Sequence, residues 1–404
     1  MKNKKVLVLA EYIGENHNST AYYWSKIVRQ LSNNFDVILV TPDSSHSRSF
    51  SDKYKVETRF VELAKHNKNS LISRLIGQVK QTIYFSRALH RELDNTDLVF
   101  TGTNPIITVF MMALIKRASP FKWLVLVHDI FPNNLVPAGV TTKNSLLYRV
   151  LTYLSKKVYS APERLICIGR DMKSLLGNKV DDSTKTTYVP NWASTETTKN
   201  EPKEKNLILT ELGWDKDSVV FQFFGNMGRL QGISNLLESI ELTTNDKARF
   251  LFIGCGSESS HVERVFKKIN DKNGYERAHY YGRLDLEKNN HGLNACDVAL
   301  VTLSNGMYGL GVPSKAYFSM AADKPIIYVG ETGTELELLL GDYRVGWHCV
   351  PEKPSKLARL IDNISESYDS RVDHQLHPRA VLEKEFSEQI ALGAITQQVK
   401  ELLK

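Results

Sequence analysis

The chain has 404 residues, of which 42% are hydrophobic and 24% are charged, so its composition excludes a largely disordered protein. Its length predicts two domains of roughly 200 residues each. The net charge of +7 is unevenly divided: residues 1–200 carry 28 Lys and Arg against 16 Asp and Glu (+12), and residues 201–404 carry 24 against 29 (−5). The basic first half predicts an anionic partner, either nucleic acid or a membrane surface.

Targeting and metal signals are absent from the sequence. The apolar run that follows residues 1–5 is too short for a secretory signal and is typical of a first strand. The longest apolar run, 106–115, falls well short of the roughly 20 residues that a membrane-spanning helix needs. The four cysteines are widely spaced and form no CxxC pair, which predicts reduced thiols in a cytoplasmic protein and no zinc site.

Strands and helices alternate along the chain. Amphipathic helices are predicted at 22–31, 71–93 and 145–159 among the strands of the first half, and a last helix is predicted at 386–404. This alternation predicts an α/β protein with two doubly wound parallel sheets, in domains 1–192 and 207–385 joined by the polar linker 193–206. The predicted strands are 6–10, 36–41, 97–101, 123–127, 164–168, 218–224, 249–253, 279–281, 298–302 and 325–329.

The clearest functional signal lies between residues 221 and 240. A β-rich apolar run stops at Gly225, and apolar residues from Ile233 onward then recur with helical spacing. A glycine-bearing turn between a strand and a helix directs free backbone N–H groups and a positive helix end at one point, which favours a phosphate. Arg229 and Lys315 supply the positive charge that a diphosphate requires.

Two segments carry a family resemblance, and shorter ones support it. They are Gly225-Asn226-Met227-Gly228-Arg229-Leu230-Gln231-Gly232 and Val312-Pro313-Ser314-Lys315-Ala316-Tyr317, with His128-Asp129, Val189-Pro190-Asn191-Trp192 and Tyr281-Gly282-Arg283 in support. In these segments, which follow one another in a matching order from residue 128 to residue 317, the chain resembles the retaining glycosyltransferases of family 4. The greatest similarity is to bacterial transferases of surface-polysaccharide, O-antigen and colanic-acid assembly.

The resemblance implies the GT-B architecture, in which two Rossmann-like domains face each other across a cleft. It places the acceptor in domain 1–192 and a nucleotide-sugar donor in domain 207–385, with helix 386–404 packing back on the first domain. It implies transfer with retention of anomeric configuration, without a cofactor or metal. The expected donor is a UDP-sugar rather than a GDP-sugar, and the expected acceptor is a glycan linked to a polyprenyl lipid.

The resemblance also assigns site residues. It gives catalytic roles to His128, Arg229 and Lys315. The donor-binding residues that it implies are Gly225, Asn226, Met227, Gly228, Gln231, Gly256, Gly282, Arg283, Ser314 and Tyr317.

One departure from the family pattern leaves an alternative open. The paired glutamates of many members are replaced by Leu310 and Phe318, which allows a non-catalytic binding or partner subunit of the same fold. Measurable donor hydrolysis would exclude that alternative. A nucleic-acid-binding protein is disfavoured because no recognised RNA or DNA motif is present. A nicotinamide enzyme is disfavoured because residues 10–19 lack GxGxxG.

A basic and aromatic stripe predicts where the first domain meets a membrane. Arg149, Tyr153 and Lys156 recur on one helical face, which is typical of helices at an anionic bilayer surface. The alternative is an ordinary amphipathic helix with snorkelling Lys and Arg side chains. With Asn18 and Ser19, Arg149 and Lys156 form the predicted acceptor and membrane side of a cytoplasmic protein peripheral to the inner face of the cell membrane.

Overall fold

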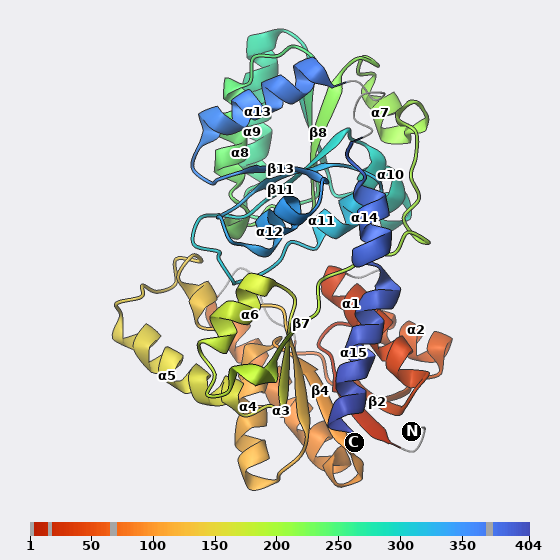
Figure 1. Ribbon diagram of the computed structural model, residues 1–404, viewed down its shortest axis with the longest axis vertical. Coiled ribbons are helices and arrows are strands. Elements are labelled where there is room, and N and C mark those ends of the chain that lie inside the picture. The colour runs from red at the N-terminus through yellow and green to blue at the C-terminus, as the bar shows by residue number, and fades with distance from the viewer. Residues whose placement is uncertain (1–3, 15–17, 65–70, 369–374) are drawn as a thin grey trace.

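Two parallel sheets, each covered by helices, form the two domains of the protein (Figure 1). The computed structural model describes residues 4–14, 18–64, 71–368 and 375–404. The N-terminal sheet has the order β3-β2-β1-β4-β5-β6-β7, and the C-terminal sheet has the order β10-β9-β8-β11-β12-β13. Every pairing is parallel, so the predicted α/β class with two doubly wound sheets is confirmed.

The N-terminal domain consists of seven strands and the helices between them. Its strands are β1 (Lys5–Leu9), β2 (Asp36–Pro42), β3 (Glu57–Val61), β4 (Leu98–Gly102), β5 (Trp123–Val127), β6 (Arg164–Cys167) and β7 (Thr186–Tyr188). Its helices are α1 (Ser19–Ser32), α2 (Ser45–Tyr54), α3 (Leu71–Glu92), α4 (Ile106–Ala118), α5 (Leu146–Ser160) and α6 (Arg170–Gly177). Helix α5 projects from the side of this domain (Figure 1).

The C-terminal domain repeats the alternation. Its strands are β8 (Val219–Phe224), β9 (Ala248–Ile253), β10 (Ala278–Gly282), β11 (Val298–Thr302), β12 (Ile326–Val329) and β13 (Gly346–Cys349). Its helices, with the final helix of the chain, are α7 (Leu207–Leu212), α8 (Ile233–Leu242), α9 (Ser259–Asn273), α10 (Asn289–Asn294), α11 (Lys315–Ala321), α12 (Glu335–Asp342), α13 (Pro354–Ser367), α14 (Pro378–Glu385) and α15 (Glu388–Leu402).

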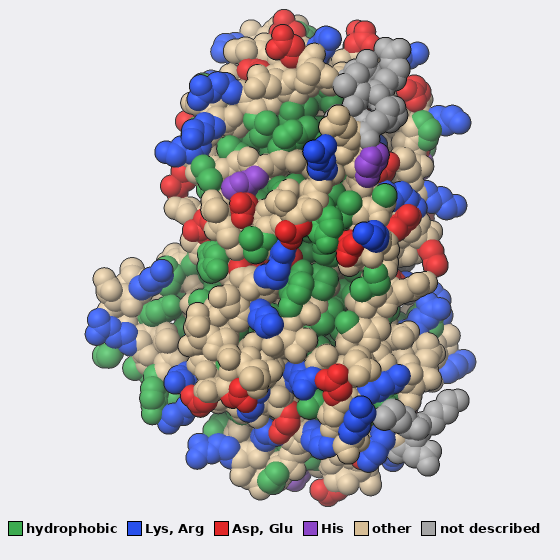
Figure 2. Space-filling model, viewed as in Figure 1, with side chains coloured by type: hydrophobic (Ala, Val, Ile, Leu, Met, Phe, Trp, Pro, Cys, Tyr) green, Lys and Arg blue, Asp and Glu red, His purple; other side chains and the backbone are tan. Residues whose placement is uncertain are grey.

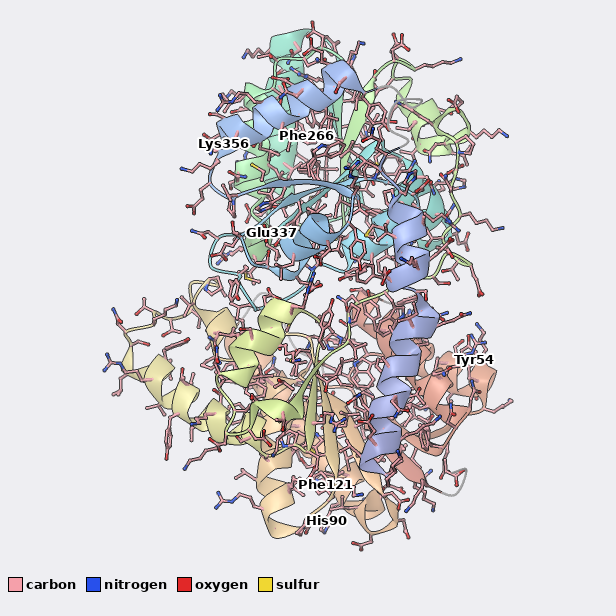
Figure 3. The ribbon with its side chains drawn as sticks, viewed as in Figure 1. Tyr54, His90, Phe121, Phe266, Glu337 and Lys356 are labelled. Carbon is pink, nitrogen blue, oxygen red and sulfur yellow. The ribbon has the colours of Figure 1, made fainter. Side chains whose placement is uncertain are left out.

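The central strands are buried on both faces, as expected for sheets covered by helices. All five residues of β5 and all five of β11 are buried. From the helical layer of the C-terminal domain, Phe266 on α9 points into the core and is 3% exposed, whereas Lys356 on α13 points outward (Figure 3). Because such strands are buried along their whole length, their sequences are continuous apolar runs, and these runs allowed the strands to be predicted.

Three strands, β3, β7 and β13, lie outside the predicted set. All three are edge strands, and exposed and partly exposed residues predominate in them. An edge strand buries less of its surface, so no continuous apolar run marks it in the sequence. The predicted helix 386–404 starts later, at Glu388, because Phe386 ends α14 and packs its ring against Tyr317 and Tyr343.

The chain crosses between the domains after β7 and again between α14 and α15 (Figure 1). The two crossing segments meet at a bridge between Ala193 and Ser387. Beyond it, α15 lies against α1, where Glu388 accepts a hydrogen bond of 2.9 Å from the Tyr22 hydroxyl and forms an ion pair of 3.2 Å with Lys26. The end of the chain therefore returns to the N-terminal domain.

A second contact joins α6 of the N-terminal domain to α12 of the C-terminal domain. The Glu335 carboxylate, 1% exposed, accepts hydrogen bonds of 2.6 Å from the backbone N–H of Arg170 and from the Tyr188 hydroxyl. The Arg170 guanidinium also pairs with Asp342 at 2.5 Å. A buried carboxylate is costly unless it is paired and hydrogen-bonded, so these bonds tie the two domains together.

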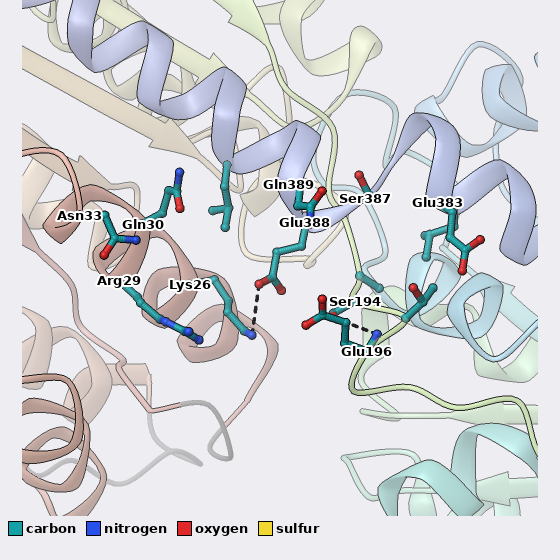
Figure 4. A pocket seen from close by; sticks show the side chains of 14 residues that line it. Lys26, Arg29, Gln30, Asn33, Ser194, Glu196, Glu383, Ser387, Glu388 and Gln389 are labelled. Atoms are coloured by element: carbon teal, nitrogen blue, oxygen red, sulfur yellow. Dashed lines mark hydrogen bonds and ion pairs between the residues drawn. The ribbon is translucent and has the colours of Figure 1, made fainter.

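A polar cavity of about 460 Å³ opens where the crossing segments meet α1 (Figure 4). Lys26, Arg29, Glu196 and Glu388 are among its lining residues, and the Lys26–Glu388 ion pair spans its edge. No residue of the predicted donor site lines it. No helix in the described part of the chain combines the length and apolar character needed to cross a bilayer.

The packing of α15 against the N-terminal domain can be tested with two isoleucines of this helix. Ile395 is 1% exposed against the N-terminal core, whereas Ile390 is 45% exposed. We expect Ile395→Ala to lower the free energy of unfolding by about 2–5 kcal/mol, because it removes buried methyl groups and leaves a cavity. Ile390→Ala is the matched control, with an expected change within about 0.5 kcal/mol. Urea unfolding measures both, and equal effects would contradict this seating.

Candidate active site

The turn after β8 and the start of α11 come together although about ninety residues separate them. Lys315 Nζ donates a hydrogen bond of 2.9 Å to Gln231 Oε1 and lies 3.9 Å from the centroid of the Phe223 ring. It would also lie 3.7 Å from a Cβ placed on Gly225. Although Lys315 keeps some solvent exposure, its crowded surroundings lower its pKa to about 7. This amine is poised to gain a proton when an anion arrives.

The loops that follow β8, β9 and β10 interlock through their glycines. The backbone N–H of Gly254 donates to the Gly282 carbonyl at 2.7 Å. Gly254 has a φ of +129°, and a Cβ on it would lie 2.0 Å from the carbonyl oxygen of Gly225. Such a distance is impossible for a real side chain, so only glycine allows the second loop to pass this close to the first.

The same close approach continues one step along the turn. The backbone N–H of Met227 donates to the Cys255 carbonyl at 3.0 Å, and Met227 is fully buried. A Cβ on Gly256 would lie 2.3 Å from the Met227 carbonyl oxygen. Gly256 therefore supports the turn through the backbone, and the Met227 side chain anchors it in the core.

The remaining residues predicted for the catalytic and donor-binding parts of the site differ in their exposure. Asn226, Arg229 and Arg283 are exposed. Ser314 is partly exposed and lies close to the Tyr23 side chain of α1, whose hydroxyl donates to the Trp192 carbonyl at 3.0 Å. Tyr317 is fully buried, with its ring 5.6 Å from that of Phe386, so its ring belongs to the core beneath α11 rather than to an open surface.

His128 lies across from this turn, at the end of β5. Its backbone N–H donates to Thr103 Oγ1 at 3.2 Å, and its carbonyl oxygen lies 3.9 Å from the Cβ position of Gly311, in the loop that leads to Lys315. Burial lowers the pKa of the imidazole to about 4, so His128 is neutral at pH 7. A neutral imidazole can donate a hydrogen bond through one nitrogen and accept one through the other.

Two carboxyl groups that follow β1 and β5, strands separated by β4 in the sheet, were not among the predicted site residues. Asp129 follows β5, and Glu11 follows β1. Burial raises the pKa of Asp129 to about 6, opposed by a hydrogen bond with Thr103. Burial raises the pKa of Glu11 to about 7, opposed by a hydrogen bond with Tyr12. Their position after central parallel strands was the available signal, since ligands bind beyond the carboxyl ends of such strands.

The residues predicted for the acceptor and membrane side lie on two helices of the N-terminal domain, α1 and α5. Asn18 is the N-cap of α1, where its Oδ1 accepts from the backbone N–H of Ala21 at 2.8 Å, and Ser19 begins the helix. On α5, Arg149 is exposed, whereas Lys156 forms an ion pair of 3.1 Å with Asp181.

Aromatic and apolar contacts occupy the positions where the family carries its paired glutamates. The Phe318 ring lies 5.4 Å from the Tyr22 ring and 6.3 Å from the Tyr23 ring of α1. Leu310 is 5% exposed in the core. Within the described residues, no group of three or more His, Cys, Asp or Glu side chains is arranged to hold a metal ion.

The strand orders of the two sheets, and the contact between the loops of the two domains, define a class of protein. Both features are those of GT-B glycosyltransferases, in which two Rossmann-like domains face each other. A family model described as "Glycosyl transferases group 1" matches residues 204–376. A curated protein of Pseudomonas aeruginosa, "Probable glycosyltransferase WbjE", is 43% identical over 400 residues, which cover 99% of this chain and 98% of that protein. The chain belongs to this glycosyltransferase family and is a transferase enzyme.

Solved structures show the same fold at low sequence identity. Anabaena Alr3699/HepE in complex with UDP has a TM-score of 0.73 at 13% identity, over 98% of this chain and 100% of that one. Sucrose-phosphate synthase from Thermosynechococcus elongatus has a TM-score of 0.75 at 15% identity, over 99% of both chains. The GT-B fold is therefore confirmed.

The interlocked turn can be tested with two glycines of positive φ. Both Gly254 (φ +129°) and Gly274 (φ +74°) have positive φ, but a Cβ on Gly274 meets nothing within 4 Å. We therefore expect Gly254→Ala to lower the thermal midpoint clearly more than the control Gly274→Ala, because only the former displaces the turn at Gly225. Equal midpoints, measured by differential scanning calorimetry, would contradict the close contact.

Proposed function

We propose that the protein transfers a sugar, with retention of anomeric configuration, from a UDP-sugar to a lipid-linked glycan during cell-surface polysaccharide biosynthesis. The observation that carries this proposal is the position of Lys315. Its amine lies over the glycine-bearing turn at Gly225, at the start of a helix, and donates a hydrogen bond to the neutral side chain of Gln231. A diphosphate placed there would receive a full positive charge and the backbone N–H groups of the turn.

The glycine-bearing turn contains backbone N–H groups that could donate hydrogen bonds to a ligand. The backbone N–H groups of Gly225 and Met227 are used by neighbouring loops, whereas those of Asn226 and Gly228 donate to no acceptor within the described residues. Arg229 adds an exposed guanidinium at the same turn. Together these groups stabilise the charge that develops on a departing diphosphate, which is the main requirement of glycosyl transfer without a metal.

The transferred sugar would lie between the turn and His128. Because the imidazole is neutral at pH 7, it can exchange hydrogen bonds with sugar hydroxyls without attracting a second anion. A phosphate oxygen of the donor would accept the proton of the attacking hydroxyl on the same face of the sugar, so no dedicated protein base is needed. The choice of uridine is supported by a protein of the same fold, HepE, which has been solved with UDP and with UDP-glucose.

The acceptor side carries an exposed apolar surface, which we call the α3–α5 patch. It contains eleven of the eighteen exposed large hydrophobic residues of the described chain. Lys143, Arg149 and Lys157 lie in or beside α5, and hydrophobic and basic side chains gather on this projection in Figure 2. The residues of the patch are Leu75, Ile76, Val79, Ile83, Leu114, Val140, Leu146, Leu147, Val150, Tyr153 and Leu154.

An apolar surface with basic residues beside it fits the interface of an anionic bilayer. We therefore propose that the protein is peripheral to the inner face of the cell membrane, with the α3–α5 patch in contact with lipid. Such a location would bring the cleft to acceptors that are anchored in the same membrane.

The role of Lys315 predicts how UDP binding depends on pH. A diphosphate favours the ammonium form, so UDP binding draws a proton onto Lys315 above its free pKa of about 7. We expect UDP affinity, measured by isothermal titration calorimetry, to fall from pH 7 to 8.5 by at most about tenfold per pH unit. Lys315→Arg should remove this dependence, because a guanidinium stays charged throughout.

Removal of the amine tests the same contact at a single pH. Lys315→Met keeps the apolar stem and should weaken UDP binding by about 1.5–3 kcal/mol, the range for a hydrogen bond to a charged group. Lys356→Met, on the outer face of α13 in the same domain, is the matched control and should leave affinity unchanged. Equal affinities of all three proteins would remove Lys315 from the donor site.

The membrane proposal predicts a selective loss of lipid binding. Leu146→Ser combined with Leu147→Ser should reduce co-sedimentation with phosphatidylglycerol-containing vesicles, because both side chains are more than half exposed on α5. Leu207→Ser, at a residue 60% exposed in the C-terminal domain, is the control. If the double variant sediments like the wild-type protein, α5 is only solvent-exposed surface.

A further inference from the structure

The connection from β11 to α11 ends at Lys315 and so determines where that amine lies. We call residues 304–314 the donor loop. Its first residue is hydrogen-bonded to the glycine-bearing turn that follows β8. Ser304 Oγ accepts from the backbone N–H of Gly232 at 3.1 Å and donates to the Arg229 carbonyl at 3.0 Å. The N-terminal end of the donor loop is therefore attached to the glycine-bearing turn.

Tyr308 of the donor loop donates its backbone N–H to Glu331 of the same domain at 2.9 Å, and the residues after it are held by the other domain. Asp171 on α6 accepts a hydrogen bond of 3.0 Å from the backbone N–H of Gly309. The side-chain amide of Asn191, which follows β7, donates to the Val312 carbonyl at 3.3 Å. Asp171 and Asn191 are each 2% exposed, so solvent does not replace these bonds. A buried N–H or carbonyl that lost its partner would incur a desolvation cost.

A third contact comes from α1. The Tyr23 side chain lies close to Ser314, which immediately precedes Lys315, and its hydroxyl donates a hydrogen bond of 3.0 Å to the Trp192 carbonyl. Three elements of the N-terminal domain thus contact a single C-terminal loop, two of them through hydrogen bonds, at Gly309 and Val312. The contacted residues lie within the last six before the lysine.

Asp171 makes the most specific of the three contacts. Its Oδ1 accepts from the backbone N–H of Met172 at 2.8 Å while its Oδ2 accepts from Gly309, so both oxygens are used. Gly309 has a φ of +70°, and a Cβ on it would lie 2.9 Å from Leu175 Cδ2 on the same helix. The donor loop therefore lies directly on α6.

We propose that Asp171 is a positioning residue for the donor site, which the acceptor-binding domain completes by holding the donor loop in place. This inference rests on the proposed function, because it assigns the loop and Lys315 to a nucleotide diphosphate. The loop contains Gly306, Gly309 and Gly311, so outside this contact its backbone would have many conformations to lose on binding. Contact with α6 removes that freedom before the nucleotide arrives, and preorganisation of this kind raises affinity.

The coupling is reciprocal. If the domain contact favours nucleotide binding, nucleotide binding must favour the domain contact by the same factor. The donor site would then be fully formed only while the two domains touch. Transfer would be restricted to the state in which His128 and the acceptor side also face the sugar.

A neighbouring contact supplies a matched control. Arg170, the residue before Asp171, pairs with Asp342 of α12 at 2.5 Å, and this bond also joins the domains but does not touch the donor loop. Asp342→Asn weakens the domain contact in general, whereas Asp171→Asn weakens the hold on the loop. In Asp171→Asn the side chain keeps one oxygen and presents an NH₂ group to a backbone N–H, so one of the two bonds is lost.

The test combines UDP affinity by calorimetry with hydrogen exchange of peptides covering residues 303–314, on the full chain. We expect Asp171→Asn to bind UDP about tenfold more weakly, the low end for a lost bond to a charged group. We also expect faster exchange in the donor loop. Asp342→Asn should retain wild-type affinity and loop exchange. Asn191→Leu removes the hydrogen bond to the Val312 carbonyl and leaves Asp171 unchanged. It should also weaken UDP binding and speed exchange in the donor loop, and it provides the test if Asp171→Asn folds poorly.

Three outcomes would overturn the proposal. Wild-type affinity and loop exchange in both Asp171→Asn and Asn191→Leu would show that the N-terminal domain does not position the loop. An equal loss in Asp342→Asn would show a general effect of the domain contact. If the wild-type protein binds no UDP, the donor assignment itself fails and with it the role of Asp171, and this failure is distinguishable because it appears before any substitution.

Discussion

Each sheet is wound in two directions from its centre, and this constraint produces the site. In the N-terminal domain the winding reverses between β1 and β4, and in the C-terminal domain it reverses between β8 and β11. At such a point the connections diverge to opposite faces of the sheet, which leaves a crevice beyond the carboxyl ends of the central strands. The glycine-bearing turn, the donor loop, His128 and Glu11 all follow central strands of one sheet or the other. The site therefore arises from topology before any particular side chain is considered.

The two walls of this site differ in charge. On the C-terminal side, Lys315 has a pKa lowered to about 7 and Arg229 is exposed. On the N-terminal side, burial raises the pKa of Glu11 to about 7 and that of Asp129 to about 6. Groups with perturbed pKa values of this kind concentrate at functional sites, where burial and neighbouring charges are arranged to shift them. A cationic wall suits a diphosphate and a carboxyl-bearing wall suits hydroxyl groups, which matches the proposed division between donor and acceptor.

Much of the fold could be predicted from the sequence because the central strands are buried on both faces. Residues 123–127 were predicted as a strand and are β5, whereas the exposed edge strand β3 carries no apolar pattern. The meeting of Lys315 with the turn at Gly225 followed from the family motifs. The burial of Tyr317 could not be predicted, because it depends on Phe386 arriving from a distant helix. The aromatic surroundings of Phe318 likewise depend on the docking of α1 from the other domain.

If Lys315 holds a nucleotide diphosphate, a crystal structure of the protein with UDP should show the diphosphate at the turn beneath this amine. We expect diphosphate oxygens at the backbone N–H groups of Asn226 and Gly228, with Lys315 Nζ moved from Gln231 to the phosphate. Density for UDP elsewhere, or at the turn with the Lys315–Gln231 bond intact, would show that Lys315 does not hold the diphosphate.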